Sequence, residues 1–111
     1  MDINPNDAIE YLIKHGKEYA KAKAESTYLE EYRKSLKAIL MQQAQVDGHQ
    51  TAAAQEREAY ADERYQDLLK GLKAAVEAEE EVRWGLVAAQ ARIDVWRSQE
   101  SSKRQEIKAV L

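Results

Sequence analysis

The strongest pattern in this chain is a heptad repeat of apolar residues in its C-terminal half. From residue 62 onward, two sets of apolar side chains recur seven residues apart, with an offset of three. This spacing places both sets along one face of a helix, and it predicts a single long helix over residues 62–105. The two sets are Tyr65, Leu72, Leu86, Ile93 and Ile107, and Leu68, Ala75, Val82, Ala89 and Trp96; Glu79, Glu100 and Lys103 interrupt them.

A shorter repeat predicts a second helix over residues 17–46. Two apolar sets again recur at intervals of seven, and Leu40 widens the stripe that they form. Gly48 follows directly, and glycine tolerates the left-handed conformation that ends many helices. We therefore expect a turn over residues 47–51. The two sets are Ala22, Leu29 and Leu36, and Tyr32, Ile39 and Val46.

Two short helices complete the prediction. Asn4 as a cap and Pro5 at the first helical position start a helix over residues 5–15. Gly16 then predicts a break, because glycine is a weak helix former.

Thr51 is a candidate N-cap for a short helix over residues 52–61, which is rich in alanine. Asp62 can cap again, so the chain can kink or restart there.

These elements predict one all-α domain, an antiparallel, coiled-coil-like helical hairpin with a long C-terminal helix. A helix of about 40 residues spans about 60 Å, which is more than one helix of 30 residues covers. We therefore expect a homo-oligomer, with a dimer favoured, while a different protein that covers the exposed end is the alternative. The predicted self-association stripe is Leu72, Val82, Leu86, Ala89, Ile93 and Trp96.

Composition agrees with a helical chain. There is one proline and no phenylalanine or cysteine, and the formal net charge is −3. Without cysteine there is neither a disulfide nor a thiolate metal site, and a mildly acidic chain is a poor binder of duplex nucleic acid. No stretch approaches the length of a membrane span. We expect a cytoplasmic protein.

The titratable residues predict no catalytic, cofactor-binding or metal site. His15 and His49 stand at apparent helix ends, without a nucleophile or converging carboxylates. The acidic run from Glu77 to Glu81 lacks a histidine partner for a di-metal site and suits a solvated face. Glu79 is the exception, since it occupies a stripe position and needs a partner there.

Trp84 is the best candidate for a binding residue. It lies off the apolar stripe beside Arg83, and an exposed tryptophan next to arginine is typical of an interface anchor. Packing of Trp84 under the N-terminal helix is the alternative. With Arg83, Arg92 and Arg97 it forms the predicted partner-binding surface.

Charge and aromatic residues leave a second function open. Residues 55–81 hold nine acids and four bases, whereas residues 82–111 hold six bases and three acids. The basic end, together with six tyrosines that can stack on bases, permits binding of single-stranded nucleic acid. Tyrosines at this spacing more often line a helical core.

Three segments resemble a family of small helical proteins of tailed phages and prophages, often encoded among early recombination and replication genes. They are YLEEYRKSLKA (28–38), TAAAQEREAYA (51–61) and WGLVAAQARIDVWRSQ (84–99). The resemblance implies a bacterial host cytoplasm and a non-enzymatic accessory role in phage DNA metabolism, carried out through protein–protein interaction. A single-stranded nucleic-acid-binding accessory protein and a structural or assembly component of the virion are the alternatives.

Overall fold

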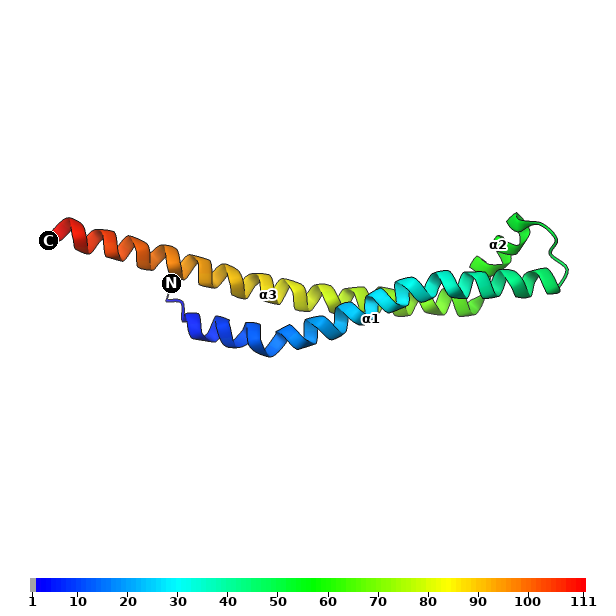
Figure 1. Cartoon of the computed structure of the whole chain (residues 1–111), viewed down its shortest axis with the longest axis horizontal. Helices are drawn as coiled ribbons and strands as arrows, with labels where there is room; N and C mark the ends of the chain where they lie inside the picture. The colour runs from blue at the N-terminus through cyan, green and yellow to red at the C-terminus, as the bar shows by residue number, and fades with distance from the viewer. Residues whose placement is uncertain (1) are drawn as a thin grey trace. The chain divides into compact units, whose positions relative to one another are not determined.

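The computed structural model describes residues 2–111, which form three α-helices and no strand. Helix α1 spans Pro5–Val46, α2 spans Ala52–Ala61 and α3 spans Glu63–Val110 (Figure 1). The chain is an all-α antiparallel helical hairpin, in which α3 runs back along α1. This confirms the predicted fold class and the long C-terminal helix.

Helix α1 runs without interruption through Gly16, so the predicted break between helices 5–15 and 17–46 is wrong. A glycine inside a helix costs only about 1 kcal/mol relative to alanine, and strong helix formers flank this one. Helix α1 therefore has 42 residues against 48 in α3. The two long helices therefore differ in length by 6 residues, less than the predicted ranges 17–46 and 62–105 imply.

The predicted helix ends are confirmed by their hydrogen bonds. Asn4 caps α1, because its Oδ1 accepts the backbone N–H of Asn6 at 3.0 Å. Gly48 follows α1 with a φ of 107°, which side chains with a β-carbon rarely adopt. Thr51 caps α2 by accepting the backbone N–H of Ala54 at 3.1 Å.

A single non-helical residue, Asp62, separates α2 from α3. Its backbone is extended, with a φ of −64° and a ψ of 135°. Its Oδ1 accepts the backbone N–H of Arg64 at 2.8 Å, in the first turn of α3. The predicted restart is confirmed, and α3 continues five residues beyond the expected end at 105.

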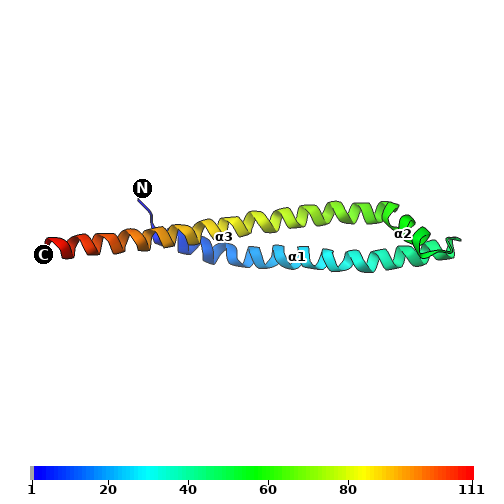
Figure 2. The same cartoon turned by 90° about the horizontal axis from the view of Figure 1, so that it is seen from above.

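The chain divides into two compact units, and α1 and α3 contribute to both. The first, called here the loop unit, is Lys21–Glu79. In it, α2 lies beside the C-terminal end of α1 (Figures 1 and 2). Its core joins all three helices and consists of Leu36, Leu40, Ala59 and Tyr65, with Met41, Leu68 and Leu69 packed against them.

The second unit, called the terminal unit, joins the start of α1 to the C-terminal part of α3, through residue 20 and from residue 80. Its two most buried residues are small, Ala8 and Ala89, which leave 1% and 0% of their surface exposed. Within this unit α3 continues past the start of α1 (Figures 1 and 2), and residues 102–111 are all exposed.

The face of α1 that contacts α3, called the seam, differs from the predicted stripe. Tyr32, Ile39 and Val46 are 39%, 44% and 83% exposed, so their placement in the core is wrong. The prediction failed because polar residues occupy seam positions while apolar residues point outward. The α1 seam, buried or half-buried throughout, comprises Ala8, Leu12, His15, Tyr19, Ala22, Ser26, Leu29, Arg33, Leu36 and Leu40.

Of the three glycines inside helices, only Gly85 has a close neighbour, the side chain of Tyr11. A β-carbon at Gly16 or Gly71 would meet nothing within 4 Å, whereas one at Gly85 would collide with the Tyr11 hydroxyl and lie 3.1 Å from Cζ. We expect Gly16→Ala and Gly71→Ala each to raise the free energy of unfolding by about 0.5–1 kcal/mol. Gly85→Ala should raise the free energy of unfolding by less than this, or lower it. Urea unfolding followed by circular dichroism measures the value for each variant.

The control is the double variant Tyr11→Ala, Gly85→Ala, in which the collision is removed. In a chain that already carries Tyr11→Ala, Gly85→Ala should raise the free energy of unfolding, as Gly71→Ala should in the parent chain. A full gain from Gly85→Ala alone would contradict the contact between Tyr11 and Gly85.

Candidate functional site

Trp84 lies on the surface of the terminal unit, with 59% of its area exposed. The guanidinium carbon of Arg83 sits 4.7 Å from the centre of its ring, within range of a cation–π interaction. This exposure decides between the two alternatives for Trp84, because an indole packed under α1 would be buried.

Glu80 holds Arg83 in place. The Arg83 Nη2 and Nε donate to Glu80 Oε2 at 2.7 and 3.0 Å. These hydrogen bonds lower the pKa of Glu80 from its ordinary value. A guanidinium bound at two points keeps a fixed orientation, and Trp84 therefore stands beside an ordered cation.

Apolar side chains continue from Trp84 along the outer side of α3. They stand at positions 87, 88, 91 and 95, and this spacing from residue 84 puts them on one helical face. Val87 and Val95 are 44% and 45% exposed, and the alanines between them are exposed too. This uncharged surface, called the Trp84 face, is Trp84, Val87, Ala88, Ala91 and Val95.

The two other arginines predicted for this surface lie differently. At 100° per residue, Arg92 is about 80° round the helix from Trp84 and borders the Trp84 face. Arg97 is about 140° round in the other direction and about 20 Å along the axis. It forms an exposed ion pair with Asp94 at 3.8 Å. The structure therefore unites Trp84 with Arg83 and Arg92 but not with Arg97.

The predicted self-association stripe faces α1 of the same chain. Ala89 is fully buried in the terminal unit, and the other members are half-buried. The hairpin uses this surface itself, so the stripe offers little area to a second copy. Leu72 lies in the loop unit, and Val82, Leu86, Ala89, Ile93 and Trp96 lie in the terminal unit.

Glu79, the acid at a stripe position, finds its partner within the loop unit. The hydroxyl of Ser26, which is only 6% exposed, donates to Glu79 Oε2 at 2.6 Å. Sequence reasoning missed Ser26, because an isolated serine carries no signal until α1 is placed in register with α3.

The histidines have ordinary surroundings. His15 lies inside α1 and not at a helix end, because α1 continues through Gly16. Its ring packs 4.1 Å from that of Tyr11, and its Nδ1 lies 2.6 Å from Glu18 Oε2. His49 follows α1 with its Nε2 3.9 Å from a carboxylate oxygen of Glu58. In residues 2–111, no three or more histidine and carboxylate side chains are grouped closely enough to hold a metal ion.

Lys37 organises a polar cluster between α1 and α2. Its Nζ lies 2.9 Å from Glu56 Oε1 and 4.7 Å from the centre of the Tyr60 ring. The interaction with Tyr60, followed in size by that with Glu56, raises the pKa of Lys37 above its ordinary value. Lys37 in turn lowers the pKa of Glu56. Tyr60 packs edge-on against buried Tyr65 with ring centres 5.2 Å apart. Both tyrosines therefore stabilise the loop unit.

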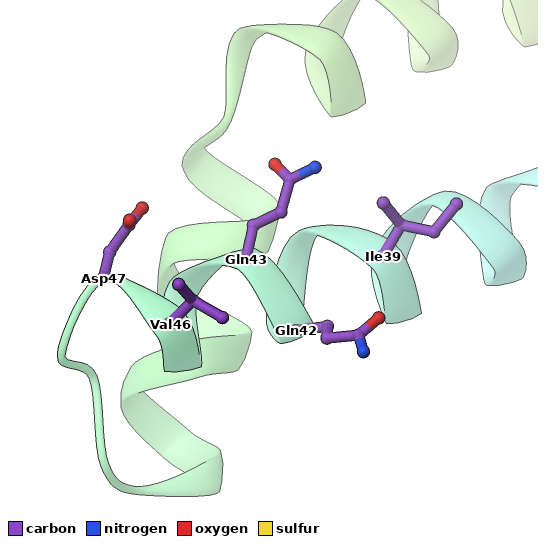
Figure 3. A pocket seen from close by; sticks show the side chains of 5 residues that line it. All are labelled: Ile39, Gln42, Gln43, Val46 and Asp47. Carbon is purple, nitrogen blue, oxygen red and sulfur yellow. The ribbon is translucent and has the colours of Figure 1, made fainter.

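A second exposed face lies on α1 in the loop unit, and it contains the residues that were wrongly expected in the core, Tyr32, Ile39 and Val46. Tyr28 is 62% exposed, and its ring stacks on Tyr32 with centres 6.0 Å apart and an angle of 8°. Ile39 and Val46 continue this face and line an open groove with Gln42, Gln43 and Asp47 (Figure 3). The surface formed by Tyr28, Tyr32, Ser35, Ile39, Gln42 and Val46 is called the outer α1 face.

Comparison with known proteins gives no further assignment. No protein-family model, curated protein or solved structure matches the chain. Within residues 2–111, none of the helices combines the length and the apolar character that crossing a membrane requires.

Proposed function

We propose that this chain is a non-enzymatic interaction protein that binds a partner protein through the Trp84 face. The observation that carries the proposal is an exposed tryptophan held beside an ordered arginine, at the start of an uncharged apolar stripe. Tryptophan and arginine are enriched among the residues that dominate binding energy at protein interfaces.

The shape of the Trp84 face indicates the chemistry of the partner. Its five residues extend over about 16 Å of helix, and the small Ala88 and Ala91 leave room beside the large indole. Such a surface fits an amphipathic helix whose apolar residues are spaced by three and four. Arg92 and Asp94 border the face, so the partner helix should carry charges of both signs at its edges.

The biological setting of the proposal is phage DNA recombination or replication in the cytoplasm of a bacterial host. It is supported by the resemblance of segments 28–38, 51–61 and 84–99 to small phage proteins. The third of these segments contains the whole Trp84 face.

Binding of single-stranded nucleic acid is the second candidate, and the stacked, exposed rings of Tyr28 and Tyr32 favour it. The charges around them favour it less. Lys34, about 160° round α1 from Tyr32, is paired with Glu31 at 3.2 Å, so no excess of positive charge accompanies the aromatic pair. Single-strand binders combine stacking with a basic groove.

The test is capture of a protein from extracts of phage-infected bacteria by the immobilised full-length chain, followed by calorimetric titration with the identified protein. Trp84→Ala should weaken binding at least thirtyfold, as expected for a residue that contributes about 2 kcal/mol or more. Its circular dichroism should not change, because the side chain is exposed.

Tyr28→Ala is the matched control, since it removes an equally exposed aromatic ring from a different helix face. It should leave the affinity unchanged. Equal binding by the Trp84→Ala variant would refute the proposal. Salt-sensitive binding of a labelled oligonucleotide that is lost in Tyr28→Ala would support the nucleic-acid alternative instead.

A further inference from the structure

The outer α1 face is a second heptad seam on a helix that already has one. Its residues follow each other at intervals of four, three, four, three and four, which is the spacing of a coiled-coil contact. All six members are exposed, although four of them are tyrosine, isoleucine or valine. Helix α1 is therefore apolar on two sides, and α3 covers only one of them.

Charge is missing from most of this face. Residues 38–46 read AILMQQAQV and contain no charged side chain. Nearer the tyrosines, Glu31 and Lys34 neutralise each other. Depletion of charge in a region that still exposes large apolar side chains is the compositional mark of an interface core. A strongly charged partner would find nothing complementary here.

We propose that the occupant of the outer α1 face is a second copy of this chain, packed antiparallel about a two-fold axis near residue 37. In this arrangement residue i faces residue 74 − i of the second copy. Tyr28 then lies opposite Val46, Tyr32 opposite Gln42, and Ser35 opposite Ile39, so that each contact joins a larger side chain to a smaller one.

A parallel pair would stack Tyr28 on Tyr28 and Val46 on Val46, with crowding at one end and space at the other. The antiparallel pair also brings the Tyr32 hydroxyl to the Gln42 amide, a donor and acceptor that the interface would otherwise bury unpaired. The face is thus complementary to itself, as a two-fold interface requires.

The size of the contact predicts a reversible dimer. Two copies bring eight large apolar side chains, each burying about 100 Å², and with the neighbouring amides the total is about 1,000 Å². That value is below the roughly 1,200–2,000 Å² that stable specific interfaces bury, so monomer and dimer should exchange. The proposal concerns the loop unit and is independent of the Trp84 face in the terminal unit.

Sedimentation of the full-length chain over a range of concentrations tests the proposal. The mass should rise from 12.7 kDa toward about twice that value. Ile39→Glu should raise the dissociation constant at least tenfold without changing the circular dichroism. Val95→Glu is the matched control, because Val95 is 45% exposed and Ile39 is 44% exposed, and it should dimerise normally.

The absence of cysteine from the chain allows single cysteines to report the direction of packing. Under oxidation, a mixture of Ser35→Cys and Ile39→Cys should cross-link, because residue 35 faces residue 39 of the second copy. A mixture of Tyr28→Cys and Val46→Cys should cross-link, whereas neither should do so alone. A monomer at every concentration, loss of the dimer in Val95→Glu but not in Ile39→Glu, or self-cross-linking of Tyr28→Cys would overturn the proposal.

Discussion

Replacing Leu40 with alanine is expected to lower the free energy of unfolding by about 2–4 kcal/mol. Leu40 is 3% exposed and packs in the core cluster of the loop unit with Leu36, Ala59 and Tyr65. Truncating a buried leucine removes its apolar contacts and leaves a cavity. Since small domains are stable by only about 5–15 kcal/mol, the variant should be largely unfolded at temperatures that the parent chain withstands.

Ile13→Ala provides the comparison, because Ile13 is also in α1 but is 74% exposed. Its free energy of unfolding should stay within about 0.5 kcal/mol of the parent value. Chemical unfolding followed at 222 nm gives both numbers. Equal losses in the two variants would mean that the core of the loop unit is not where the structure places it.

The terminal unit should respond as strongly to a charge at Ala89. This residue is fully buried between α3 and the start of α1, and Ala89→Glu would place a carboxylate there without a partner. Burying an unpaired charge costs about 3 kcal/mol or more. We expect loss of protection from amide exchange in residues 5–20, because α1 must separate from α3 to hydrate the new group.

Ala88→Glu is the control, because it makes the same substitution one position away from Ala89. Ala88 is exposed, so the helix propensity changes equally while no charge is buried. This variant should keep the stability of the parent chain to within about 0.5 kcal/mol. Exchange protection lost in both variants would show that the seam does not pass through Ala89.

The sequence predicts α3 well because its seam is built from apolar residues. Tyr65 and Ala89, the two members that the structure buries most deeply, both belong to the predicted stripe. The caps at Asn4 and Thr51 were also predictable, because a side chain that bonds a nearby backbone N–H needs no tertiary information.

Helix α1 was harder to predict because packing overrides local preference there. Ser26 and Arg33 occupy seam positions, so hydrophobicity alone extended the predicted stripe to Tyr32 and Ile39, about 120° round the helix from them. Ser26 is accommodated in the seam because its hydroxyl finds, besides the Lys23 carbonyl of its own helix, an acceptor in Glu79 of α3. That pairing depends on the register between two helices and cannot be read from either one. The break expected at Gly16 failed for a related reason, since the seam stabilises the helix on both sides of it.

The candidate site was predictable in part. Trp84 stood out because it lies off the stripe beside Arg83, and the structure exposes it. Arg97 was added on charge alone, without regard to its angle round the helix. The outer α1 face was visible as the interval of seven between Tyr32, Ile39 and Val46, but the sequence cannot tell a covered apolar stripe from an uncovered one.

Asp62 gives the fold a sensitivity that its three helices do not suggest. The residues before and after it are strong helix formers, and one extended residue is all that keeps α2 and α3 apart. Two topologies are therefore compatible with the local helix propensity of this segment. In one, α2 folds back onto α1 with Ala59 and Tyr60; in the other, Ala52 to Val110 would be one straight helix. The carboxylate at position 62 favours the folded-back topology by capping α3, and it acts together with the contacts that hold α2 against α1, the Lys37–Glu56 ion pair and the packing of Ala59 in the core.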